Sequence, residues 1–161
     1  MKKHEVSVFN TGIKSGIIIS SLLIIYFLIM RNFHLTGSAI AWGFNFVIIF
    51  IGITYTYRYF REQTKLNIDY LPGLLLGSLT TIVCTVLFTI FVYIYFSTID
   101  PISLIILKDN ILFMSGQLTP LKVSAATLIE GICSGFIISF TMMQYYKSGF
   151  KNQLGEKKAN G

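Results

Sequence analysis

One acidic residue, Glu130, lies well inside a long apolar stretch of the sequence, about two and a half helical turns after the stretch begins. A carboxyl group at membrane depth is costly unless it faces other helices, water or a binding partner, so Glu130 is a candidate functional residue. Asn45 enters a second apolar stretch to a similar depth and is the first-choice partner for Glu130. Thr85, Thr89 and Ser134 complete a candidate polar site within the membrane.

Three interpretations of this candidate site are open. A protonated Glu130 can donate a hydrogen bond to Asn45 or to a threonine and so hold helices together. Alternatively, Glu130 can take up and release a proton or an ion. Glu130 can also lie close enough to the outer interface to be hydrated, with no special role. A helical wheel places Thr127, Ser134, Thr141 and Gln144 on the Glu130 side. A separate apolar face is expected to meet lipid and comprises Ile129, Ile132, Phe136, Phe140 and Met143.

No catalytic or metal-binding motif accompanies these residues. The two histidines, His4 and His34, fall in a terminal segment and a short loop, and the two cysteines, Cys84 and Cys133, fall in apolar stretches without metal-ligand spacing. The sequence has no signature of hydrolases, zinc proteases or phosphate-binding loops. We therefore predict a protein that is not an enzyme and that has no catalytic, metal-binding or cofactor-binding residues.

The composition points to a membrane as the solvent of this chain. Of its 161 residues, 53% are hydrophobic and 12% are charged, about half the charged fraction of a soluble domain. The net charge of +6 is explained by basic residues that flank apolar segments, so a nucleic-acid partner is not expected. The expected surroundings are the lipid bilayer, with its anionic headgroups near the basic residues.

The apolar stretches predict an all-α, polytopic membrane protein with four transmembrane helices. Each stretch is long enough to cross a bilayer, and together they cover residues 12–30, 39–57, 71–96 and 121–146. A short helix over 100–116 is expected to lie along the outer interface, with a re-entrant loop as the alternative for 100–120. Thr119 and Pro120 are expected to cap and open the fourth helix. The membrane domain then covers 1–150, and 151–161 form a polar cytoplasmic tail that is expected to be disordered.

The distribution of Lys and Arg predicts the orientation of these helices. With the N-terminus inside, ten basic residues lie on the cytoplasmic side and three lie outside, the latter being Arg31, Lys108 and Lys122. Short loops follow this bias, so both termini are predicted to be cytoplasmic and the membrane to be the bacterial inner membrane.

Small residues at four-residue spacing mark three faces on which helices could pack closely. They are Gly12, Gly16 and Ser20 in the first stretch, Gly73, Gly77, Thr81, Thr85 and Thr89 in the third, and Gly131, Gly135 and Ser139 in the fourth. Packing within one chain, a face for a second copy or another membrane protein, and coincidence are the three explanations.

The order of these features resembles a family of small uncharacterised membrane proteins common in Bacteroidetes, classified as a domain of unknown function. The resemblance is carried by Tyr57-Arg58-Tyr59-Phe60-Arg61-Glu62, by Gly73 and Gly77, and by Ile99-Asp100-Pro101. It covers most of the chain and implies four spans, with no activity, substrate or cofactor.

The leading functional hypothesis is therefore a non-enzymatic structural or accessory component of the inner membrane. The alternative is a small proton-coupled transporter or channel subunit that uses Glu130, with Asn45 and the threonines of the third helix lining a path. A membrane enzyme is a third hypothesis, for which the sequence offers no catalytic residues.

Overall fold

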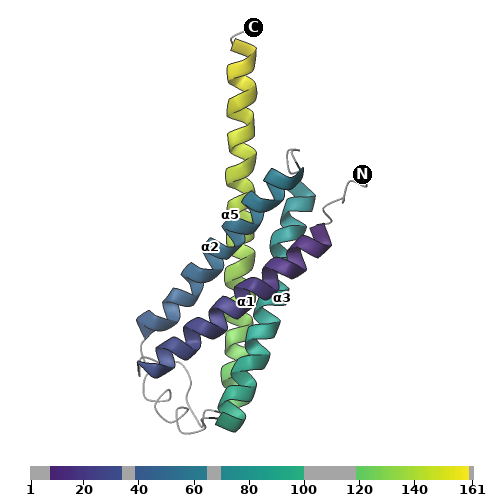
Figure 1. The fold of residues 1–161 in the computed structure, drawn as a ribbon. Helices are drawn as coiled ribbons and strands as arrows, with labels where there is room; N and C mark the ends of the chain where they lie inside the picture. Colours follow the sequence, from purple (N-terminus) through teal and green to yellow (C-terminus); the bar gives the residue numbers. More distant parts are fainter. Residues whose placement is uncertain (1–7, 34–38, 65–69, 100–118, 160–161) are drawn as a thin grey trace.

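The fold of the chain is a set of long helices packed side by side (Figure 1). The structure is a computed structural model and describes residues 8–33, 39–64, 70–99 and 119–159. All secondary structure in these ranges is helical, which confirms the predicted all-α class. The helices are α1 (Val8–Asn32), α2 (Ala39–Thr64), α3 (Tyr70–Ile94), a π-helical turn η1 (Tyr95–Ile99) that continues α3, and α5 (Pro120–Ala159).

Contacts between the helices show in which direction each one runs. Gly12 of α1 lies against Leu79 of α3, and Gly16 lies against Val83, so α1 and α3 run parallel. α2 returns the chain between them, because Gly52 contacts Ile19 while Phe44 pairs with Tyr26. α5 is antiparallel to α3, and Figure 1 shows the two ends of the chain at the same end of the molecule.

The closest packing joins α3 to α5. The small-residue faces of the two helices meet one to one, as Gly77 with Ser139, Thr81 with Gly135, and Thr85 with Gly131. At each contact a Cβ atom built on the glycine would lie within 2.5 Å of the opposing side chain. The small-residue face of α1 packs against α3 in the same way at Gly12 and Gly16. These faces are therefore used within the chain, as the first of the three explanations predicted.

An aromatic cluster fills the space where α1 ends and α3 passes into η1. Phe27 of α1 is 1% exposed, and its ring lies edge-on to four rings at centroid distances of 5.0 to 6.4 Å. The four rings belong to Phe88, Phe91, Tyr95 and Phe96. Because the π-helical turn contributes two of them, it belongs to the buried core rather than to a loose connection.

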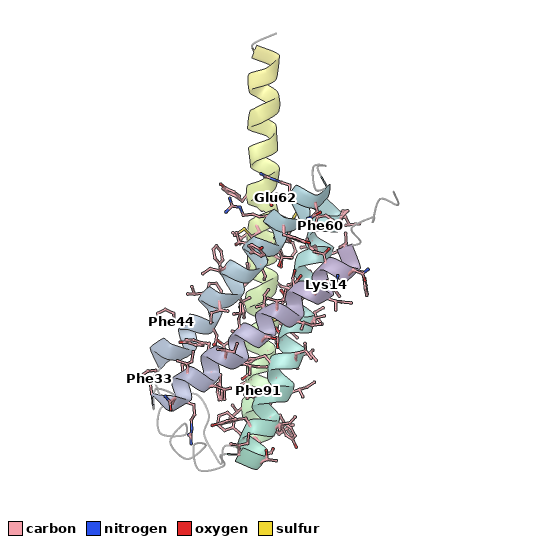
Figure 2. The ribbon with its side chains drawn as sticks, viewed as in Figure 1. Lys14, Phe33, Phe44, Phe60, Glu62 and Phe91 are labelled. Atoms are coloured by element: carbon pink, nitrogen blue, oxygen red, sulfur yellow. The ribbon has the colours of Figure 1, made fainter. Side chains whose placement is uncertain are left out.

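The other end of the molecule is held by a buried hydrogen bond between α2 and α3. The hydroxyl of Tyr57, which is fully buried, donates to the carbonyl oxygen of Gly73 at 2.7 Å. Figure 2 shows Phe60 and Glu62 at this end of α2 and Phe44 at the opposite end, with Lys14 on the outside of α1.

Three of the described helical segments are long and apolar enough to cross a membrane: Val8–Asn32, Leu71–Ile99 and Pro120–Tyr145. α2 is long enough, with 26 residues, but Thr, Tyr and Arg dominate its C-terminal part. Its described residues are therefore not apolar enough to count as a membrane span. The protein is thus a multi-pass membrane protein by these criteria. The predicted interfacial helix over 100–116 lies outside the described residues.

Both ends of α5 bear on predictions from the sequence. The Thr119 hydroxyl accepts a hydrogen bond from the amide of Lys122 at 3.4 Å, which confirms the predicted cap. The expectation of a disordered tail is wrong up to Ala159, because α5 continues past the apolar segment without a break. No proline interrupts residues 146–159, and a helix that is already nucleated propagates readily.

Candidate functional site

A small cavity lies where all four long helices of the described chain approach one another. Its walls combine polar and apolar side chains from α1, α2, α3 and α5, and the space open to the centres of water molecules is about 30 Å³. The lining residues are Leu23, Asn45, Phe46, Ile49, Thr85, Phe88, Thr127, Glu130, Gly131 and Ser134. A cavity of this size holds one or two water molecules or a small ion.

Glu130 stands at the mouth of this cavity. Its side chain is exposed although it lines the cavity, whereas Leu23, Thr85 and Phe88 at the floor are at most 3% exposed. Glu130 lies ten residues into the apolar segment Pro120–Tyr145, about 15 Å from its start and within about 4 Å of its middle. It is the one acidic residue of the three membrane-spanning segments described. A carboxyl group is thus presented near mid-membrane depth.

Asn45 reaches the cavity from α2. Its Oδ1 atom is buried and has no hydrogen-bond partner, and a buried acceptor without a partner costs about 1–3 kcal/mol. Glu130 also forms no hydrogen bond or ion pair with any residue in the described part of the chain. The two side chains that were predicted to bond to each other therefore share one cavity without doing so.

Thr85 and Gly131 form the floor beneath Glu130. Thr85 of α3 is 3% exposed, and a Cβ atom on Gly131 would lie 2.5 Å from its Cγ2 atom. Only glycine at position 131 lets the two helix backbones approach this closely. Because Gly131 follows Glu130 directly in the sequence, the close contact between α3 and α5 lies next to the acidic residue.

Two hydroxyl groups on α5 present oxygen lone pairs rather than protons to the cavity. Ser134 donates its hydroxyl proton to the carbonyl oxygen of Gly131 at 3.1 Å, and Thr127 donates to that of Val123 at 2.9 Å. A hydroxyl that has given its proton to the backbone remains an acceptor. The polar lining is therefore rich in acceptor oxygens.

The structure brings together four of the five residues of the predicted site. Asn45, Thr85, Glu130 and Ser134 all line the cavity, but Thr89 does not, and its buried hydroxyl oxygen has no partner among the described residues. Thr89 lies one turn further along α3, beyond Phe88 at the cavity wall. The sequence analysis did not predict the apolar walls, because no pattern within one helix shows which of its apolar residues will face a cavity.

The predicted lipid-facing side of α5 is right in part. Ile129 and Phe140 are 64% and 47% exposed, but Met143 is 1% exposed and belongs to the core. Met142, next to it, faces Thr54 of α2, whose hydroxyl lies 3.7 Å from the Met142 sulfur. Met143, which the helical wheel assigned to lipid, is therefore part of the buried core.

Neither cysteine takes part in the cavity. Cys84 is buried and Cys133 is exposed, and both are free thiols. No group of three or more His, Cys, Asp or Glu side chains lies close enough to hold a metal ion within the described residues. The arrangement can bind a proton, a water molecule or a small cation through oxygen atoms.

The fold and the cavity together define a class, a multi-pass helical membrane protein with a small, partly open cavity among its helices that contains one carboxyl group. Residues 14–148 match the family described as "Protein of unknown function (DUF4199)", and the chain belongs to this family. No curated protein and no solved structure matches the chain.

Proposed function

We propose that this protein is a small proton-coupled transporter or channel subunit in which Glu130 takes up and releases a proton. The observation that carries the proposal is the cavity, where side chains from four helices converge on the one acidic residue of the described spans. A carboxyl group that only held helices together would be hydrogen-bonded across an interface, and Glu130 has no such bond to the described residues.

We further propose that α2 makes a fourth crossing. The support is topological: α1 and α3 run parallel, so if both cross the bilayer in the same direction, the chain must cross back between them. α2 is the connecting helix, and its 26 residues span about 39 Å, more than the ~30 Å hydrocarbon core. With ten basic residues on the side of the termini, the proposed orientation places both ends in the cytoplasm of a bacterial cell, with the protein in the inner membrane.

We propose that a second copy of the chain completes the transport path, so that the purified protein is sufficient for transport. The cavity is too small to form a path through the membrane by itself. The small-residue faces are occupied within the chain, so a second copy or another membrane protein would pack on outward apolar faces instead. These include the surface of α2 around Phe44, Val47 and Ile51.

A second candidate function is that of a non-enzymatic accessory component of the membrane. The feature that favours it is the length of α5, which continues for 14 residues beyond Tyr145, or about 21 Å, outside the packed helices (Figure 1). Such a helix offers a surface to another protein without any transport through Glu130.

Proton flux in liposomes separates these functions. Purified protein is reconstituted with a pH-sensitive dye inside the vesicles, and uptake is followed after a pH step. The proposal expects flux that is lost in Glu130→Gln and kept in Glu62→Gln, a matched control at an exposed position at the end of α2. Equal flux in wild type and Glu130→Gln would reject the proton-coupled function.

Cysteine labelling tests the fourth crossing. In a background with Cys84→Ser and Cys133→Ser, single cysteines at Lys65 and Lys108 are expected to react with an impermeant maleimide from opposite sides of the membrane. Labelling of both from one side would overturn the proposed topology.

A further inference from the structure

We infer that the cavity is a binding site for one monovalent cation of the Na⁺ type, held by oxygen atoms of Glu130, Asn45, Thr85 and Ser134. The inference rests on the proposed function, because it names a second occupant for the same site. A proton and a Na⁺ ion at one carboxylate exclude each other, which is the arrangement that an exchanger or a cation-driven carrier requires.

The first argument is the kind of atom that faces the cavity. The polar residues that line the cavity are Asn45, Thr85, Thr127, Glu130 and Ser134, and each of them carries an oxygen atom that can accept a hydrogen bond or bind a cation. Ser134 has already given its proton to the Gly131 carbonyl oxygen. Oxygen ligands suit hard cations, whereas zinc and other transition metals favour sites with nitrogen and sulfur.

The second argument is charge. Glu130 is the only titratable group among the ten lining residues. The other helices contribute no charged side chain to the cavity: Leu23 comes from α1, Asn45, Phe46 and Ile49 come from α2, and Thr85 and Phe88 come from α3. One carboxylate neutralises one positive charge. A divalent ion would keep a net positive charge at membrane depth, where an unpaired charge is costly, and Ca²⁺ normally takes 6–8 oxygen ligands.

The third argument is size and position. About 30 Å³ admits a small ion with or without one water molecule, and it excludes an organic ligand, whose pockets measure about 300–1,000 Å³. The ion would sit between the buried Thr85 and the carboxyl group of Glu130. It would also give the buried Asn45 oxygen the partner that it lacks within the described chain.

Equilibrium binding of ²²Na⁺ tests this inference on the full chain, purified in detergent at pH 8 with choline as the balancing cation. We expect saturable binding of one Na⁺ per chain. The affinity should fall about tenfold or more in Glu130→Gln and in Ser134→Ala, since loss of even an outer partner of a bound metal costs about 10–100-fold. Glu62→Gln should bind like the wild type. The affinity of the wild type should also fall as the pH is lowered, because protons compete for Glu130.

A second measurement guards against loss of folding in the variants. A cation that binds only the folded protein raises the midpoint of thermal unfolding as its concentration rises. Na⁺ should therefore raise the midpoint of the wild type and of Glu62→Gln, but not that of Glu130→Gln, while choline should raise none of them. Absence of saturable Na⁺ binding to the wild type, or equal binding by folded Glu130→Gln, would overturn the inference.

The two proposals can fail separately. Glu130-dependent proton flux in a protein that binds no Na⁺ would leave the proposed function standing and overturn the cation site. Na⁺ binding that depends on Glu130, in a protein with no proton flux, would support the cation site and reject the proposed function.

Discussion

Substitution of Gly135 by alanine tests the close packing of α3 on α5. The new methyl carbon would meet the Thr81 side chain and would lie 2.8 Å from the Thr81 Cβ atom. Carbon atoms in ordinary contact are about 3.5–4.0 Å apart, so the two helices must separate by about 1 Å. Thr81 cannot turn away cheaply, because it is β-branched and its hydroxyl donates to the Gly77 carbonyl oxygen at 2.9 Å.

The free energy of unfolding changes through two opposing effects. Overpacking of a tight interface costs about 1–3 kcal/mol. Alanine in place of glycine favours the helix by about 1 kcal/mol. Gly43→Ala on α2 is the matched control, because a Cβ atom at Gly43 meets no atom within 4 Å and only the favourable effect remains. The two variants should therefore differ by about 1–3 kcal/mol, with Gly135→Ala the less stable.

Unfolding by SDS in mixed micelles, followed by circular dichroism, measures this difference. Thr81→Ala removes two of the three Thr81 atoms that crowd the new methyl group and leaves only Cβ. The double variant Thr81→Ala/Gly135→Ala should therefore regain part of the loss, with a coupling energy of about 1 kcal/mol. If Gly135→Ala were as stable as Gly43→Ala, the small-residue contacts would not be close-packed, and the alignment of Gly131 beneath Glu130 would lose its basis.

Two further predictions concern the ends of the packed helices. Tyr57→Phe removes the buried hydrogen bond to Gly73 and should lower the free energy of unfolding by about 1–2 kcal/mol. The same change at the exposed Tyr59 should have little effect. Equal losses in the two variants would contradict a stabilising role of this hydrogen bond. Phe27→Ala empties the centre of the aromatic cluster and should cost about 3–5 kcal/mol in the same assay. Phe9→Ala, at a 57% exposed position, should cost less than about 0.5 kcal/mol.

Much of the fold could be predicted from the sequence because it depends on signals local to each helix. Apolar runs of membrane length predicted where the helices lie, and the cap at Thr119 was recognised from Thr-Pro before an apolar run. The glycines at four-residue spacing identified the packing faces, since close approach of helices in lipid needs small residues. Glu130 stood out for the same reason, as a carboxyl group among apolar residues.

The partners of each face were decided only by the tertiary structure. A helical wheel predicts which residues share a side of one helix, but not how far that helix slides or tilts against its neighbours. The register of α3 against α5 sets Thr85 beneath Gly131 and leaves Thr89 outside the cavity, although both threonines belong to one ladder. Met143 is buried in the core, although the helical wheel of α5 assigned it to lipid.

The cavity at Glu130 shows the same division. The sequence determined that a carboxyl group must be accommodated near mid-membrane depth, because its position within an apolar segment follows from counting residues along one helix. The tilt and spacing of four helices decide that Glu130 and Asn45 line the same small cavity without a hydrogen bond between them. Those are set by the sum of many contacts between distant residues, which no local pattern contains.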